Sequence, residues 1–158
     1  MKVSATGNGT GDVLAEIYDA TPGASFTTTT PRLVNVSVLK HLGSGLTVGF
    51  VVGGVSSRNI LIRAVGPTLG NAPFNVGGTV SDPQLALFAG STRMNENNDW
   101  GGTPALTTAF ATVGAFALPA GSRDAALMAT LSPGSYSVQV SGVGGTTGLA
   151  IVEIYEVP

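Results

Sequence analysis

The chain has no cysteine and little charge, and both shortages restrict what it can be. Without cysteine, the fold depends on its core or on a bound metal rather than on disulfides. Charged residues make up 10% of the sequence, against roughly 25% in ordinary soluble domains. No basic run occurs, and the longest apolar runs, such as Leu46–Val52, are broken by glycine and are far shorter than the roughly 20 residues of a membrane-spanning helix. We therefore expect neither nucleic-acid binding nor membrane insertion.

Groups that could perform catalysis are also scarce. His41 is the only histidine, and a zinc site or a nucleophilic triad would need further partners for it. Ser44 lacks the glycine that follows the serine of a nucleophile elbow. Glu16 and Glu153 lie in β-branched or apolar runs, which favours solvent-facing positions on edge strands over a glycosidase pair. We predict that the chain is not an enzyme.

Glycine, threonine and serine are abundant, and they favour short strands joined by tight turns. Such strands at short spacing predict an all-β fold, an antiparallel β-sandwich of jelly-roll type. At most one short helix is expected, near residues 103–113, where Thr103 can act as N-cap before Pro104. The strands are expected near residues 2–6, 13–19, 32–39, 46–53, 58–65, 84–88, 91–95, 124–131, 135–142 and 148–156.

The beginning of the chain repeats its end. Residues 3–19 align without a gap with residues 140–156, and eight of the seventeen positions are identical. We interpret residues 1–19 as a hairpin equivalent to the closing hairpin of a preceding repeat, residues 20–31 as a linker rich in threonine, proline and glycine, and residues 32–158 as a complete module. The identical pairs are Val3/Val140, Ser4/Ser141, Gly7/Gly144, Thr10/Thr147, Gly11/Gly148, Glu16/Glu153, Ile17/Ile154 and Tyr18/Tyr155.

The repeated hairpin carries an apolar set, Val13, Leu14, Ile17 and Tyr18, that needs a surface to cover it. We expect an ordered hairpin, packed either on its own domain or on a neighbouring molecule. Disorder in this fragment is the third alternative. These residues are therefore the candidate assembly residues, and copies of the chain or adjacent repeats are the expected partners.

Polar oxygen donors gather in one loop. Asn97, Asn98 and Asp99, together with Asp82 and Asp124, form a candidate calcium site, because Ca²⁺ binds hard oxygen ligands on glycine-containing loops. The alternative is a set of Asx turns with no metal. No cofactor other than calcium is expected.

Two further residues invite a choice between structure and binding. Trp100, the only tryptophan, is a candidate for stacking on a sugar ring, or it plugs the end of the sandwich. Arg63 shares a strand face with Leu61 and Val65, so it needs a partner, and Asp99, Asp124 or backbone carbonyls are the candidates. We interpret Arg63 as a structural pin between the sheet and a loop.

Several motifs carry a family resemblance. DPQLALF at 82–88, NNDW at 97–100 and the stretch at 125–140 that contains SPGSYSVQV resemble the bacterial pre-peptidase C-terminal domain. LIRAVGPTL at 61–69, VGAFALPAGS at 113–122 and TTGLAIVEIYEVP at 146–158 are similar to repeated β modules of large secreted proteins of environmental bacteria.

The resemblance implies a non-catalytic, exported sandwich that is appended to or repeated within larger extracellular proteins. Some relatives bind Ca²⁺ in the loop matching Asn97-Asn98-Asp99, where asparagine here lowers the available charge. Met1-Lys2-Val3 does not open a signal peptide, so we expect the export signal upstream of this chain, in a secreted or cell-surface bacterial protein.

From these observations we predict a structural or adhesive repeat module that self-associates end to end or through strand-mediated contacts. The alternative is a carbohydrate-binding accessory module of a secreted hydrolase.

Overall fold

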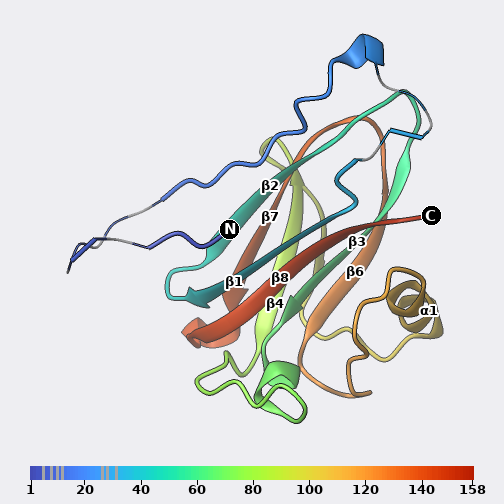
Figure 1. Ribbon diagram of the computed structural model, residues 1–158. Coiled ribbons are helices and arrows are strands. Elements are labelled where there is room, and N and C mark those ends of the chain that lie inside the picture. The colour runs from blue at the N-terminus through green and yellow to red at the C-terminus, as the bar shows by residue number, and fades with distance from the viewer. Residues whose placement is uncertain are drawn as a thin grey trace. The chain divides into compact units, whose positions relative to one another are not determined.

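The computed structural model spans residues 1–158 (Figure 1). It describes every residue except Ala5, Asn8, Thr10, Asp12, Phe26, Thr28 and Pro31. The chain divides into two units, Met1–Leu33 and Val34–Pro158.

The first unit has little regular structure. It contains the short 3-10 helix η1 (Gly23–Ser25), and its described residues form no strand. The strands predicted at 2–6 and 13–19 are therefore not formed in that part of the chain, and Ala5 lies outside the described residues. The physical reason is that an isolated two-stranded hairpin is marginally stable in water and needs a sheet to pack against.

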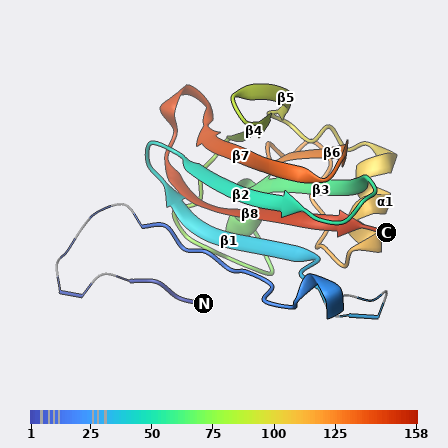
Figure 2. The same cartoon turned by 90° about the horizontal axis from the view of Figure 1, so that it is seen from above.

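The second unit is a sandwich of two antiparallel four-stranded sheets (Figures 1 and 2). One sheet has the order β1-β8-β3-β6 and the other β2-β7-β4-β5. This confirms the predicted all-β class and the sandwich architecture. The strands are β1 (Asn35–Leu42), β2 (Leu46–Val52), β3 (Arg58–Val65), β4 (Pro83–Ala89), β5 (Thr92–Asn97), β6 (Ala125–Leu131), β7 (Gly134–Gly142) and β8 (Gly148–Val157).

The main core lies between the two sheets. In most strands alternate residues point inward, for example Ile60 and Ile62 of β3 against Leu85 and Leu87 of β4, whereas β5 supplies no core residue. This alternation follows from the two-residue period of a strand. Apolar burial of this kind contributes roughly 25 cal/mol per Å² and is the main stabilising term of the unit.

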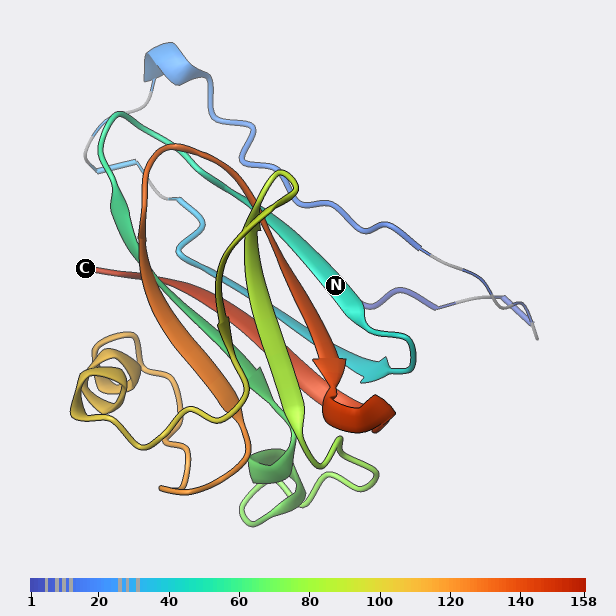
Figure 3. The same cartoon turned by 180° about the vertical axis from the view of Figure 1, so that it is seen from behind.

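A second layer covers the outer face of the β1-β8-β3-β6 sheet. The helix α1 (Pro104–Thr112) and the segment after it pack Leu106 and Phe110 against Leu61 and Val65. Figure 3 shows α1 beside β6 from behind. Because both faces of β3 are covered, its sequence is almost continuously apolar rather than alternating.

The helix begins as the sequence predicts. The Thr103 side chain accepts a hydrogen bond from the Leu106 backbone N–H, and Pro104 occupies the first turn. Two further 3-10 turns, η2 (Pro67–Gly70) and η3 (Val143–Gly145), connect strands. None of the helices in the described residues is long and apolar enough to cross a membrane.

Candidate functional site

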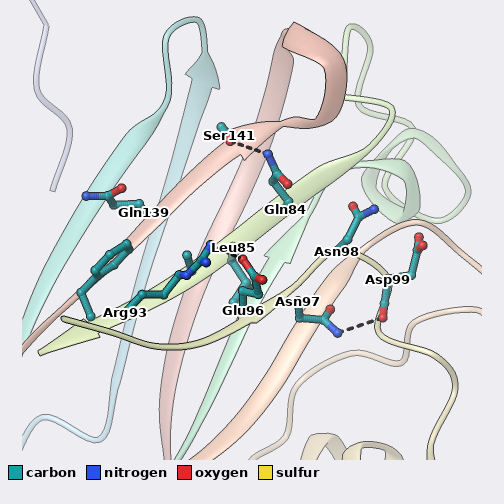
Figure 4. Close-up of a pocket in the computed structure, with 11 residues that line it drawn as sticks. Gln84, Leu85, Arg93, Glu96, Asn97, Asn98, Asp99, Gln139 and Ser141 are labelled. Atoms are coloured by element: carbon teal, nitrogen blue, oxygen red, sulfur yellow. Dashed lines mark hydrogen bonds and ion pairs between the residues drawn. The ribbon is translucent and has the colours of Figure 1, made fainter. Parts of the chain in front are cut away.

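The candidate site is an open groove on the outer face of the second sheet, where β4, β5 and β7 lie side by side (Figure 4). It has a volume of about 680 Å³. Its lining is mostly polar, with one aromatic ring. The lining residues are Gln84, Leu85, Ala86, Phe88, Arg93, Glu96, Asn97, Asn98, Asp99, Gln139 and Ser141.

Hydrogen bonds order part of this lining. Gln84 Nε2 donates to Ser141 Oγ at 3.1 Å, which links neighbouring strands β4 and β7. Arg93 Nη1 and Glu96 Oε2 form an ion pair at 2.6 Å on β5 (Figure 4). Both partners of that pair are more than half exposed, so it contributes little stability. The groove thus offers amides, a hydroxyl, the carboxylate of Asp99 and one neutralised charge pair to a ligand.

The predicted calcium ligands have different surroundings, and Asp124 is fully buried within protein hydrogen bonds. Its Oδ1 accepts from the backbone N–H of Gly66 at 2.9 Å and of Thr68 at 3.3 Å. Its Oδ2 accepts from the hydroxyls of Thr68 and Ser122, the latter at 2.7 Å. Asp124 is therefore a structural hub that ties the β3–β4 connection to β6.

Among the other candidates, Asn97, Asn98 and Asp99 line the groove, and Asp82 directly precedes β4. Asp82 Oδ2 pairs with Arg123 Nη1 at 3.1 Å. Asn97 uses both ends of its amide, since Nδ2 donates to the Asp99 carbonyl and Oδ1 accepts from the Ala126 N–H, each at 2.9 Å. Among the described residues, no three acidic or histidine side chains come together as a metal site. Calcium binding at these positions stays a prediction.

Trp100 is buried, with 4% of its surface exposed. Its indole N–H donates to the Pro119 carbonyl and to Ser122 Oγ, both at 3.1 Å, and its ring lies 5.5 Å from the Phe110 ring. A sugar ring has no access to such a side chain, so this burial does not fit the predicted glycan-stacking role. The alternative interpretation, a tryptophan that fills a structural gap, describes the observed position.

Arg63 and Glu153 form a buried ion pair between sheet and helix. They lie directly opposite each other on β3 and β8, with Arg63 Nε 3.1 Å from Glu153 Oε2. Arg63 Nη1 also donates to the Phe116 carbonyl at 2.7 Å, and its guanidinium stacks over the rings of Phe110 and Phe116, 4.7 and 4.3 Å from their centroids. The predicted pin between sheet and loop is present, but its carboxylate partner is Glu153 instead of Asp99 or Asp124.

The solvent-facing edge position predicted for Glu153 is wrong. β8 lies between β1 and β3, and Glu153 is 4% exposed. Tyr155 donates its hydroxyl proton to Glu153 Oε1 at 2.8 Å. Burial, together with the hydrogen bond to Glu153 and its charge, raises the pKa of Tyr155 to about 12. Burial lowers the pKa of Arg63, and the negative charge of Glu153 partly offsets this decrease.

The candidate assembly residues belong to the first unit. Val13, Leu14, Ile17 and Tyr18 are all exposed there. Tyr18 donates its hydroxyl proton to Glu16 Oε1 at 2.8 Å, and this contact raises the pKa of Tyr18. Their role in assembly stays a prediction. The equivalent pair in β8 is Tyr155 and Glu153, which are also hydrogen-bonded to each other. The repetition of both residues in the sequence was a signal that could have identified this pair.

Comparisons with known proteins give a fold neighbour. No family model matches the chain, and no curated protein matches it. Among solved structures, it is similar to the pre-peptidase C-terminal domain of collagenase from Bacillus anthracis. The two share 13% sequence identity at a TM-score of 0.44, over 77% of this chain and 89% of that one.

Proposed function

We propose that the chain is a non-catalytic structural module of a tandem array in a secreted or cell-surface bacterial protein, with copies of itself or adjacent repeats as partners. One observation carries the proposal. The repeated segment, residues 3–19, corresponds to the end of β7, the turn after it and most of β8.

The place of β8 in the fold gives this repeat its meaning. β8 is hydrogen-bonded on both sides, to β1 and to β3, and it supplies Val152 and Ile154 to the core and Glu153 to the buried ion pair. A second copy of such a strand matches the closing strand of a neighbouring sandwich of the same kind. The repeating unit is then a whole sandwich with its linker, and repetition extends length and valency.

The buried polar groups support a structural role. Asp124 is engaged by backbone and hydroxyl donors, and Arg63 and Glu153 are engaged by each other. His41 lies on β1 with an exposed side chain. The contacts of Asp124, Arg63 and Glu153 within the protein are consistent with a structural role for these groups.

The test is the solution mass of the chain across a concentration series, measured by light scattering. A truncation of residues 1–20 is the matched control, because it keeps the complete sandwich. We expect the full chain to form concentration-dependent oligomers and the truncated chain to stay monomeric. Monomers in both samples up to millimolar concentration would refute self-association through the repeated segment.

A second candidate function is the binding of a neutral glycan in the groove. The specific observation is the lining of Gln84, Gln139, Ser141 and Phe88, which combines hydrogen-bonding groups with an aromatic ring. Affinity electrophoresis in soluble xylan, β-glucan and dextran tests this candidate. Retention that is lost in Gln84→Ala and kept in Thr47→Ala, on the neighbouring strand β2, would support it. Equal mobility with and without every polysaccharide would oppose it.

A further inference from the structure

The position that β8 occupies, between β1 and β3, has two candidate strands in this one chain. The first is β8 itself, and the second is the repeated segment of residues 11–19. We propose that residues 11–19 are a second β8 that can replace β8 between β1 and β3, so that neighbouring modules or copies exchange strands. This inference deepens the proposed array and rests on the same repeat.

A retained glycine is the first support. A Cβ atom on Gly148 would lie 2.5 Å from the Val80 backbone N and 2.6 Å from the Thr79 carbonyl carbon, so only glycine fits there. Its counterpart is Gly11, where nothing lies within 4 Å of an added Cβ. The surroundings of Gly11 do not require a glycine, whereas a residue in the position of Gly148 must be glycine. Docking of this segment in the β8 position would explain why residue 11 is glycine.

The two faces of the strand are the second support. On the core face, Ala150, Val152 and Ile154 correspond to Val13, Ala15 and Ile17. Valine in place of Ala150 adds two methyl groups, and alanine in place of Val152 removes two, so the total side-chain volume on this face is unchanged.

On the opposite face, the pair that binds Arg63 is identical. Glu16 and Tyr18 correspond to Glu153 and Tyr155, and each tyrosine hydroxyl lies 2.8 Å from its glutamate. Segment 11–19 therefore carries the carboxylate that the buried arginine requires. An apolar or neutral strand in the same place would leave Arg63 buried without a counter-charge.

The path of the chain is the third support. The Glu156 N–H donates to the Val34 carbonyl at 2.9 Å, so a strand in the β8 position ends beside the start of β1. Asp19 would take the place of Glu156, and residues 20–33 would close the connection to Val34 as a loop. Closing a flexible loop of this size costs little more than closing a shorter one.

The correspondence is limited to the strand. Gly142, before η3, tolerates no Cβ because it would lie 1.9 Å from the Thr146 carbonyl oxygen, and its counterpart is Ala5. The repeat therefore does not keep the glycine that this turn requires. The inference therefore concerns replacement of β8 alone, with β7 kept.

Disulfide trapping tests the exchange in the full chain, which has no cysteine of its own. Leu39 lies opposite Ile151, whose counterpart is Leu14. Because the Val34 and Glu156 pair is hydrogen-bonded, strand alternation makes the Leu39 and Ile151 pair non-hydrogen-bonded, where side chains are closest. The reporter is Leu14→Cys with Leu39→Cys, and the positive control is Leu39→Cys with Ile151→Cys.

Two controls make the result specific. Ala15→Cys with Leu39→Cys has nearly the same tether, but its first cysteine would face the core and not residue 39. Gly148→Ala weakens β8 and leaves residues 11–19 intact, so it should shift occupancy toward the copy. Gly11→Ala with Gly148→Ala removes the required glycine from both strands.

We expect the disulfide between positions 14 and 39 to form at least tenfold faster in the Gly148→Ala background than in its absence. We also expect Gly148→Ala to keep the native fluorescence of Trp100 and the double alanine variant to lose it. A bridge within one chain or between two copies supports the proposal. A bridge rate no higher than that of the wrong-face control overturns it, whether Gly148→Ala is folded or not. The light-scattering result stands separately, so failure here does not imply failure of the array.

Discussion

We predict that removal of the Glu153 charge strongly destabilises the fold. In Glu153→Gln, the fully buried guanidinium of Arg63 loses its carboxylate at 3.1 Å and keeps the Phe116 carbonyl and two aromatic rings. Breaking a buried pair from one side costs about 3–5 kcal/mol. We expect the free energy of unfolding to fall by about that amount.

The assay is urea unfolding followed by the fluorescence of Trp100, the only tryptophan. With a urea m-value of about 2 kcal/mol per M, the loss corresponds to a midpoint roughly 2 M lower. Glu96→Gln is the matched control, since its ion pair with Arg93 is shorter, at 2.6 Å, but exposed. It should cost under about 1 kcal/mol. Burial and not distance decides the difference.

The double variant Arg63→Met, Glu153→Leu distinguishes the effect of an unpaired buried charge from the effect of losing the ion pair as a whole. It removes both charges at once and should recover most of the stability lost in Glu153→Gln. A loss under about 1 kcal/mol in Glu153→Gln, at an unchanged m-value, would refute the claim that this ion pair is buried and mutually dependent.

Three further predictions concern groups on the same side of the sandwich. The pKa of Tyr155 is raised to about 12 from an ordinary 10, so folding favours its neutral form. The free energy of unfolding should therefore hold below pH 10 and fall as the pH rises to 12. Tyr155→Phe should flatten this part of the plot of urea midpoint against pH. Asp124→Asn places an amide against backbone and hydroxyl donors and should cost about 3 kcal/mol in thermal unfolding, whereas a neutral effect would contradict the hub. Trp100→Phe loses two hydrogen bonds and should cost about 1–2 kcal/mol in urea unfolding without changing polysaccharide retention in electrophoresis.

Local sequence signals account for the strands and the helix of the second unit. The turns rich in glycine and proline bound each apolar run, and Thr103-Pro104 marks the start of α1. Strand order could not be predicted in this way, because sandwiches of different topology share the same alternation.

The errors follow from that missing order. Glu153 looks like an edge residue until β8 is placed between β1 and β3. For Trp100, a loop residue, the sequence left a choice between exposure and burial, and its place beneath α1 and the segment after it decides for burial. The apolar pattern at residues 13–19 matches that of β8 but forms no strand, because a strand depends on neighbours that pair with it and not on its own residues alone.

The register of β1 against β8 also determines how the module would respond to tension. Asn35 lies opposite Tyr155, so the chain enters and leaves the sandwich at the same end of one strand pair. Force between Val34 and Pro158 therefore peels β1 from β8, loading the perpendicular hydrogen bonds one after another instead of shearing them together. We expect such a module to open at low force from β1 inward, and the proposed array to lengthen by unzipping under load.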